Sequence, residues 1–543
     1  MTDVREGLAP RVATPGRDGP TVCIIGSGVA GALTAWKLGR AGVRTLILEA
    51  GPRYPREEAA QRMQRFMEGD YPWQSNWPER DVYSSVGEVD YPLNDHRVQG
   101  VGGTTLHWHG YSYRFLESDF RMRTRYGLAE DWPISYDDLE PYYGEAEVEL
   151  GVACEEDNPF AAPRSQEFPL PGFPWAYDER FTVAAAERLG ITFHSVPQAR
   201  TSEAYRGRPA CETYGVCRVC PIRARYGADI HVELAEATGH VTVVPDARVV
   251  RLETGGSDRV TRAIYRTRDG TEHAVTAEAF VLAAHAVESP RLLLLSAQSG
   301  HPDGLANSSG AVGKYFMEHM GQLRHATLDR PLYPSRTGFQ TTISQQFHDR
   351  EDRDEASGFL FRGVAEVGPS PESFIAEVAL RSGNWGEEFA REVLERIDEE
   401  YGRTMLIGSN AEALPSEDNR VDLDPELTDV FGDPAPRLTY GISEYERRGY
   451  EDGDRWIHDL ADALGARSLG PMYNRFGSHQ AGTCRMGSDP ASSVVDPNLR
   501  THDVENLYVV GSSNFVTHSL VNPTLTIAAL ALRLGDHLVR RAG

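Results

Sequence analysis

Three glycines near the N-terminus have the spacing of a loop that holds the phosphates of a dinucleotide. Gly26, Gly28 and Gly31 follow the short apolar run Val22–Ile25 and open a helical pattern. In that setting the first glycine allows a tight turn, the second lets the backbone approach a pyrophosphate, and the third lets helix and strand pack closely. Glu49 lies 18 residues beyond Gly31, after a second apolar run, where a carboxylate can bind ribose hydroxyls. The sequence therefore predicts a dinucleotide site, without separating FAD from NAD.

A histidine and an asparagine near the C-terminus have side chains that could move or position a proton. His479 precedes Gln-Ala-Gly, and a neutral imidazole can accept a hydroxyl proton near pH 7. Asn522 stands 43 residues later, directly before Pro523. This dipeptide is also typical of a plain helix start, with an N-cap asparagine and a proline at the first helical position. Without further context, a histidine at such a position is more often an ordinary surface or core residue.

Longer motifs carry a family resemblance. Residues 102–109 read Gly-Gly-Thr-Thr-Leu-His-Trp-His, residues 479–487 read His-Gln-Ala-Gly-Thr-Cys-Arg-Met-Gly, and residues 521–527 read Val-Asn-Pro-Thr-Leu-Thr-Ile. Together with the glycine loop, they resemble the glucose-methanol-choline (GMC) family of FAD-dependent alcohol oxidoreductases, across essentially the whole chain. Residues 102–108 are most similar to the pyranose 2-oxidase branch and its bacterial relatives that oxidise sugars and glycosides, such as glycoside 3-oxidases.

The resemblance implies roles for individual residues. It aligns His479 with the family's catalytic histidine, which takes the hydroxyl proton while hydride leaves the carbon for flavin N5. It aligns Asn522 with the asparagine that binds the substrate hydroxyl beside that histidine. The helix from Pro523 would direct its partial positive charge at the pyrimidine edge of the reduced flavin. The residues expected to hold FAD are Gly26, Gly28, Gly31, Glu49, Gly102, Gly103, Thr105, His107, Val249, Gly511, Ser512, Asn522, Pro523 and Thr524.

Other histidines and cysteines raise the question of a covalent flavin or a metal. His107 aligns with the histidine that is bonded to the flavin 8α-methyl group in pyranose 2-oxidase, so FAD could be linked here or simply packed beside a buried histidine. His107 and His109 alone supply too few ligands for a metal. Cys211, Cys217 and Cys220 suggest a zinc or iron–sulfur site, but a fourth nearby cysteine is missing and a structural turn is favoured. No metal is expected.

The predicted reaction is FAD-dependent oxidation of a secondary hydroxyl at C2 or C3 of a sugar or glycoside to a ketone, with O2 or a quinone as the electron acceptor. The alternatives are oxidation of a non-sugar alcohol such as choline, an aryl alcohol or a sterol, a non-redox lyase with this fold, and a flavin-binding protein without catalysis. The region Gly338–Phe361 offers groups that could bind a sugar, although it could also be a solvated loop. These groups are Gln340, Thr341, Gln345, Phe347 and His348.

The elements that would position these residues belong to an α/β fold. Strands at Val22–Ile25 and Thr45–Leu48, with a helix between them, open a doubly wound parallel sheet. We expect a discontinuous Rossmann-like FAD-binding domain with an inserted α+β substrate domain built on a β-sheet. The FAD-binding domain would cover residues 18–320 and 468–543, and the substrate domain residues 321–467.

Further helices are predicted at Tyr136–Glu149, from Ser289 behind Pro290, and at Leu525–Val539. Within the inserted region, one acidic amphipathic helix is predicted at Trp385–Tyr401.

The composition limits the partners. Of 543 residues, 55 are Lys or Arg and 80 are Asp or Glu, which gives a formal net charge of −25. Such a surface repels phosphate backbones and anionic lipids, and it weakly disfavours anionic substrates. Six cysteines do not make a disulfide scaffold, and the N-terminal residues lack the apolar core of a secretory signal. We therefore expect a cytoplasmic protein with a small-molecule substrate and no nucleic-acid or membrane partner, and the oligomeric state stays open.

Overall fold

The computed structural model describes residues 19–68, 73, 82–213, 217–332, 338–364, 387–399 and 401–542. It begins with the predicted strand–helix–strand unit of β1 (Val22–Ile25), α1 (Val29–Arg40) and β2 (Thr45–Leu48). All four residues of β1 are buried. A short run of this kind is typical of a parallel strand that is covered on both faces.

Three strands from distant parts of the chain complete the sheet around β1. They are β7 (Val241–Val244), β11 (Ala279–Leu282) and β20 (Leu507–Val509), and the order is β20-β11-β1-β2-β7 with every pair parallel. Because β20 comes from the C-terminal part of the chain, the sheet is discontinuous in sequence. The predicted α/β fold with a Rossmann-like sheet is confirmed.

Helices cover this sheet. Helix α11 (Thr524–Ala542) packs along both α1 and α4 (Tyr136–Leu150), while α1 also contacts α6 (Asp229–Glu236). Helix α4 begins at the predicted residue and ends one residue later than predicted, and α11 is slightly longer than predicted at both ends. The last helix of the chain therefore packs against the first.

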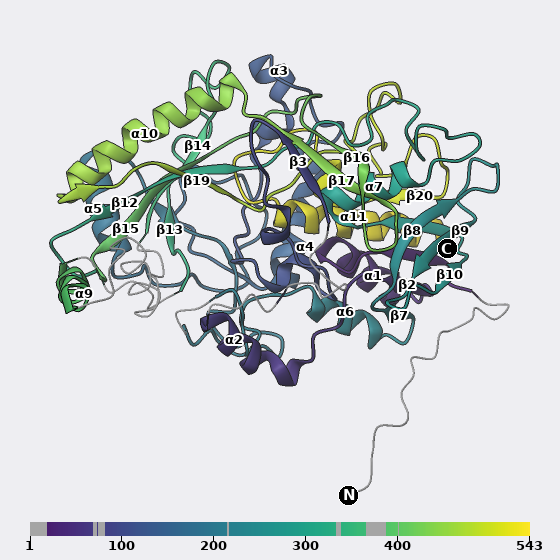
Figure 1. The fold of residues 1–543 in the computed structure, drawn as a ribbon, viewed down its shortest axis with the longest axis horizontal. Coiled ribbons are helices and arrows are strands. Elements are labelled where there is room, and N and C mark those ends of the chain that lie inside the picture. The colour runs from purple at the N-terminus through teal and green to yellow at the C-terminus, as the bar shows by residue number, and fades with distance from the viewer. Residues whose placement is uncertain are drawn as a thin grey trace, which may run out of the picture.

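A second, antiparallel sheet lies on the opposite side of the molecule (Figure 1). Four of its strands are in the order β14-β15-β12-β18, and the fifth, β19, also pairs with β12. Helices α5 (Glu179–Arg188) and α10 (Glu444–Leu464) pack against this sheet, where Phe359, Ile407 and Ile457 belong to one buried apolar cluster. The strands are β12 (Met320–Thr327), β14 (Phe359–Val364), β15 (Thr404–Ala411), β18 (Ser468–Leu469) and β19 (Tyr473–Phe476).

A third sheet joins an early segment to a late one. Strand β3 (Ser84–Gly87) runs parallel to β17 (Pro434–Tyr440), which pairs with β16 (Arg420–Thr428). Tyr91 and Tyr440 lie in the apolar cluster beside it. The ring of Tyr91, after β3, also contacts that of Phe476 in β19, with centroids 4.9 Å apart.

Helix α7 (His285–Leu295) corrects one prediction, because it begins four residues before Ser289 and holds Pro290 in its interior. A proline there cannot donate a hydrogen bond to the carbonyl oxygen of Ala286. The hydroxyl of Thr483 donates to that oxygen instead, at 2.7 Å. The helix can therefore continue through the proline.

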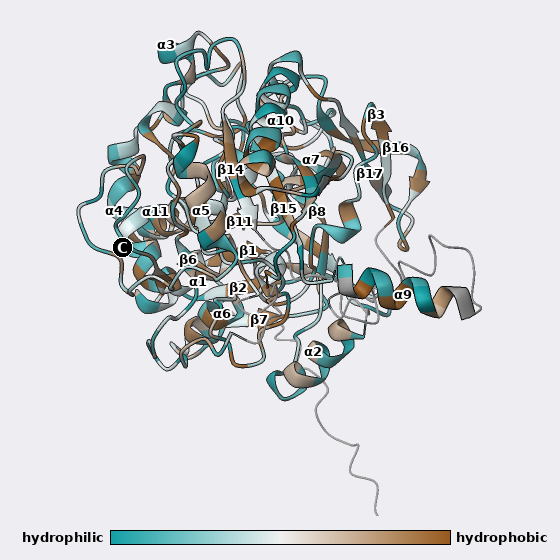
Figure 2. Cartoon of the chain, turned by 90° about the vertical axis from the view of Figure 1, so that its left-hand side faces the viewer, coloured by the Kyte–Doolittle hydropathy of each residue, from teal (hydrophilic) through white to brown (hydrophobic). Residues whose placement is uncertain are grey.

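The remaining elements are short or lie at the edges, and Figure 2 shows the outward face of α10 as largely hydrophilic. The predicted helix at Trp385–Tyr401 is α9 (Glu387–Glu399), and Trp385 falls outside the described residues. None of the helices in the described ranges combines the length and apolar character needed to cross a bilayer. The other elements are α2 (Ala59–Met67), α3 (Met122–Tyr126), β4 (Val152–Ala153), β5 (His194–Ser195), β6 (Gln198–Ala199), β8 (Arg248–Glu253), β9 (Arg262–Arg266), β10 (Glu272–Val275) and β13 (Thr342–Ile343).

Candidate active site

A cavity of about 1000 Å³ runs from the parallel sheet to the antiparallel sheet. It is lined by the turn after β1, by Gly511 after β20, by residues of β14 and β15, and by the segment after β19. The carboxyl ends of parallel strands are where open α/β sheets bind ligands. Every residue predicted to be catalytic or to bind the cofactor lines this cavity except Gly31 and Gly102, which contact residues of its wall.

The turn between β1 and α1 has the shape that the glycine spacing predicted. Gly26 has φ +100°, and a Cβ at Gly31 would lie 2.0 Å from the carbonyl oxygen of Gly26. At Gly28 no protein atom lies within 4 Å of the position that a Cβ would take. Gly28 is also the N-cap of α1 and supplies no capping side chain. The turn therefore offers a helix N-terminus and open space to an anionic group such as a pyrophosphate.

Glu49, directly after β2, is hydrogen-bonded to this turn. Its Oε2 atom accepts hydrogen bonds from the backbone N–H of Ser27 at 2.9 Å and from the Ser27 hydroxyl at 2.6 Å, and Oε1 accepts from the N–H of Gly51 at 2.9 Å. Burial raises the pKa of Glu49, while these hydrogen bonds act in the opposite direction. The carboxylate thus lies at the cavity wall with its orientation fixed.

The two catalytic candidates meet in the wall of this cavity. His479 follows β19, and its Nε2 atom lies 2.7 Å from Nδ2 of Asn522. Asn522 is held at the start of α11, where the carbonyl oxygen of Pro523 accepts a hydrogen bond from the N–H of Ile527. Burial lowers the pKa of His479 well below its usual value, and the nearby His319 and His518 lower it further. The imidazole is therefore neutral at pH 7 and able to accept a proton.

His107 lies on the turn after the 3₁₀ helix Gly103–Leu106 and is 2% exposed. Its Nδ1 atom is 3.5 Å from Nη1 of Arg218. Burial lowers the pKa of His107 well below its usual value, and the charge of Arg218 adds to this effect. The ring is neutral and borders the cavity, which is compatible with either a covalent or a packed cofactor.

Buried polar atoms of the cavity wall without a hydrogen-bond partner in the described part of the chain include Nδ1 of His109, the hydroxyl oxygen of Tyr113 and Oδ1 of Asn410. A buried polar group without a partner costs free energy, so such atoms in a cavity indicate a polar ligand.

Comparison with known proteins decides the family. Two family models described as GMC oxidoreductase match residues 96–321 and 415–531, and a third, an NAD(P)-binding Rossmann-like domain, matches residues 24–55. The fructose dehydrogenase large subunit of Gluconobacter japonicus is 34% identical over 95% of this chain and 97% of its own length. The chain belongs to the GMC oxidoreductase family.

Other GMC relatives and a solved structure agree with this assignment. The 2-methyl-1,2-propanediol dehydrogenase of Mycolicibacterium austroafricanum is 31% identical over 97% of this chain and 96% of its own length. The crystal structure of pyridoxine 4-oxidase from Mesorbium loti shares the fold, with a TM-score of 0.65 at 19% identity over 96% of this chain and 99% of that one. The pyranose 2-oxidase of Tricholoma matsutake is 24% identical over only 58% of this chain and 57% of its own length. The protein is thus a GMC oxidoreductase that resembles pyranose 2-oxidase only distantly.

The sugar contacts predicted in Gly338–Phe361 are wrong for four of the five side chains. Gln340 lines the cavity, but Thr341 donates its hydroxyl to the buried carboxylate of Glu179 at 2.9 Å. His348 contacts the buried Asp119 at 3.0 Å. Gln345 accepts a hydrogen bond from Asn158, and Phe347 stacks on Phe359. These polar side chains stabilise the fold because they satisfy buried partners.

Sequence reasoning missed Glu318, the carboxylate that holds the backbone of His479. Its Oε1 atom accepts hydrogen bonds from the N–H of His479 at 2.7 Å and of His319 at 2.9 Å, and its Oε2 atom accepts one from the Tyr91 hydroxyl. The side chain of Gln480 in turn donates to that hydroxyl. Burial raises the pKa of Glu318 to about 7. A lone acid among apolar neighbours was the signal that could have indicated it.

The cysteine turn shows no metal geometry. Within the part of the chain that the structure describes, no three His, Cys, Asp or Glu side chains are grouped as metal ligands. The thiol of Cys211 instead lies 3.6 Å from Nη1 of Arg200, and the thiol of Cys220 accepts a hydrogen bond from the N–H of Arg225.

Proposed function

We propose that this GMC oxidoreductase uses FAD to oxidise a secondary hydroxyl of a neutral sugar or glycoside, at C2 or C3, to a ketone. The observation that carries the proposal is the His479–Asn522 pair in the wall of the cavity. The neutral Nε2 atom of His479 takes the hydroxyl proton, while the amide N–H of Asn522 donates to the hydroxyl oxygen and positions it. Hydride then leaves the carbon that bears this hydroxyl, which becomes the ketone carbon.

FAD is the cofactor that the cavity fits. The open space at Gly28 and the N-terminus of α1 suit its pyrophosphate, and Glu49 lies where the adenosine ribose would bind. When bound, FAD supplies the acceptor for the hydride. We assign FAD binding to residues 18–320 and 468–543 and substrate binding to residues 321–467. The protein residues assigned to the cofactor are Gly26, Gly28, Gly31, Glu49, Gly102, Gly103, Thr105, His107, Val249, Gly511, Ser512, Asn522, Pro523 and Thr524.

The proposed substrate class is supported by polar atoms in the cavity wall and by the names of two relatives. The unpartnered atoms of His109, Tyr113 and Asn410 suit several hydroxyl groups on one ligand. The 34% identical relative is named a fructose dehydrogenase, and the 6'''-hydroxyparomomycin C oxidase of Streptomyces lividus is 30% identical over 97% of this chain. Either O2 or a quinone takes the electrons afterwards.

A second candidate is a small non-sugar alcohol, favoured by the 31% identical 2-methyl-1,2-propanediol dehydrogenase. Steady-state kcat/KM should separate the two. We expect neutral monosaccharides or glycosides to exceed choline, aryl alcohols, short diols and gluconate by at least roughly tenfold, since a site built for hydroxyl groups rejects ligands that leave its polar atoms unpaired. If a diol, choline or an aryl alcohol is preferred by an order of magnitude, the sugar assignment is wrong.

We further propose that His107 carries the FAD covalently. Acid precipitation should then leave flavin in the protein pellet, and His107→Ala should release it into the supernatant. His109→Ala is the matched control, because His109 also borders the cavity and should not alter the linkage. Flavin found free after precipitation of the unaltered protein would remove the covalent assignment and leave the rest of the proposal unaffected.

A further inference from the structure

We propose that His319 is a positioning residue that fixes the neutral His479 ring in the tautomer with an unprotonated Nε2 atom. The inference rests on the proposed function, in which Nε2 is the base. A neutral imidazole carries its proton on either nitrogen, and only the form with a free Nε2 lone pair can take the substrate proton.

A chain of three hydrogen bonds sets the tautomer. The Nε2 atom of His319 lies 2.6 Å from the carbonyl oxygen of Ser519, and a carbonyl oxygen can only accept. The proton of neutral His319 is therefore on Nε2, and its Nδ1 atom has a free lone pair. That Nδ1 atom lies 3.0 Å from Nδ1 of His479, which must donate. His479 is left with an unprotonated Nε2 atom, to which the amide of Asn522 donates at 2.7 Å.

The surroundings keep His319 neutral and in place. The residue is fully buried, and burial lowers its pKa to about 4. The ring of His518 stacks on it with centroids 3.9 Å apart, and Nε2–H of His518 donates to the carbonyl oxygen of His479. Glu318 accepts from the backbone N–H of both His319 and His479. The two rings are therefore held relative to one another through a shared carboxylate.

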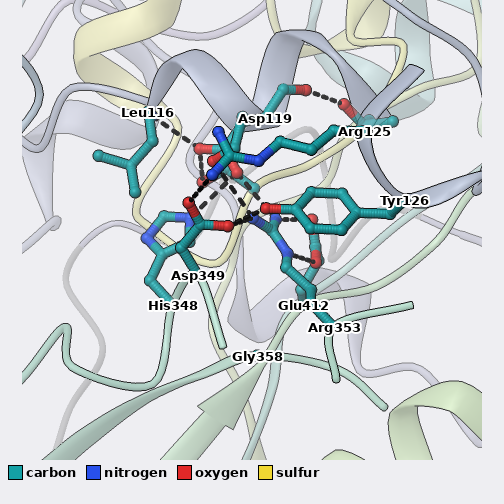
Figure 3. A network of polar contacts seen from close by, with 12 residues as sticks. Leu116, Asp119, Arg125, Tyr126, His348, Asp349, Arg353, Gly358 and Glu412 are labelled. Carbon is teal, nitrogen blue, oxygen red and sulfur yellow. Dashed lines mark hydrogen bonds and ion pairs between the residues drawn. The ribbon is translucent and has the colours of Figure 1, made fainter. Parts of the chain in front are cut away.

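Ser519 is in turn bound through its hydroxyl to a buried ionic network, of which Figure 3 shows Asp119, Arg353 and Glu412. The Ser519 hydroxyl donates to Oδ2 of Asp119 at 2.7 Å, and Ser519 has φ +36°, a conformation that an unconstrained serine rarely adopts. Asp119 forms an ion pair with Arg353 at 2.9 Å, and Arg353 pairs with Glu412 at 2.8 Å. All three side chains are completely buried. None of these three side chains lines the cavity, yet they hold the residue that supplies the first acceptor of the chain.

Two substitutions separate the two hydrogen bonds of His319. In His319→Asn the amide oxygen can replace Nδ1 as the acceptor for His479, whereas in His319→Gln the longer side chain can reach Ser519 only. We expect His319→Gln to slow anaerobic flavin reduction by a sugar roughly 10–100-fold, the range for partners that orient a functional histidine. The sugar concentration at half-saturation should change little, and His319→Asn should recover most of the rate.

The tautomer of His479 can be measured without a substrate, so this inference can be tested independently of the proposed function. In protein labelled with ¹⁵N-histidine, the signals lost in His479→Ala identify the His479 ring. In the unaltered protein they should show a protonated Nδ1 and an unprotonated Nε2, and in His319→Gln a mixture of tautomers. A protonated Nε2 atom in the unaltered protein, or equal rates in both His319 variants, would overturn the inference. If the nitrogen signals are as expected but no sugar reduces the flavin, the proposed function fails and the positioning role stands.

Discussion

Replacing His479 with alanine should slow flavin reduction by a neutral sugar by roughly 10²–10⁴-fold, the range for a positioned general base. The effect should fall on the rate of reduction, and FAD should stay bound, because His479 follows β19 of the antiparallel sheet and is not part of the glycine turn between β1 and α1. Rapid mixing without oxygen measures this rate directly.

The pH dependence of flavin reduction also tests the role of His479 as the base. Burial lowers the pKa of His479, so the base stays unprotonated as the pH falls through the usual histidine range. The rate of reduction by the unaltered protein should therefore be constant down to about pH 6.5 and decline only below it. His458→Ala is a matched control, because that histidine is exposed on α10. If His479→Ala reduces its flavin at the rate of the control, the proposed mechanism is wrong.

Substitutions in the glycine turn should remove the cofactor in two different ways. Gly28→Ala should leave the fold intact, because its φ is −63° and a Cβ there meets no protein atom within 4 Å. The added methyl group would instead enter the space of the pyrophosphate and weaken FAD binding roughly 10–100-fold, as overpacking by about 1–3 kcal/mol implies. Gly31→Ala should destabilise the turn itself, because its Cβ would lie 2.0 Å from the carbonyl oxygen of Gly26.

Bound flavin per chain and Tm together separate these outcomes. We expect Gly28→Ala to lose flavin with the Tm of the apoprotein unchanged, and Gly31→Ala to lose flavin and Tm together. Gly441→Ala is the control, because a Cβ there meets its nearest atom at 3.8 Å, an ordinary contact. Full retention of flavin by Gly28→Ala would place the dinucleotide elsewhere.

Local patterns predicted the parallel sheet well but missed a long helix of the second sheet. Strands β1 and β2 are recognisable because helices bury them on both faces, which leaves an uninterrupted apolar run. Helix α10 was missed because Gly449 and Gly453 resemble helix breakers. In the structure a Cβ at Gly449 would lie 2.7 Å from that of Ser357, and one at Gly453 would lie 2.3 Å from the hydroxyl of Ser409. Both glycines allow close packing, a tertiary requirement that no local window contains.

The candidate site also has a part that local motifs predict and a part that depends on tertiary contacts. Motifs identified His479, Asn522 and the glycine turn because their spacing is local or matches a family. Motifs could not identify the residues that orient His479. His319 contacts His479, and Ser519 contacts His319, only because the folded chain brings these distant segments together. Their role depends on which atom donates and which accepts in each hydrogen bond, and the spacing of residues in the chain does not encode this.

The central claim is that this protein transfers hydride from a sugar to its flavin, with His479 as the base. It is tested most directly by mixing the oxidised protein with neutral sugars and glycosides in the absence of oxygen and following its visible flavin absorption. We predict that at least one of them removes this absorption rapidly with the unaltered protein, yields one equivalent of ketone, and acts far more slowly with His479→Ala. Flavin that stays oxidised with every sugar, or that His479→Ala reduces equally fast, would contradict the account.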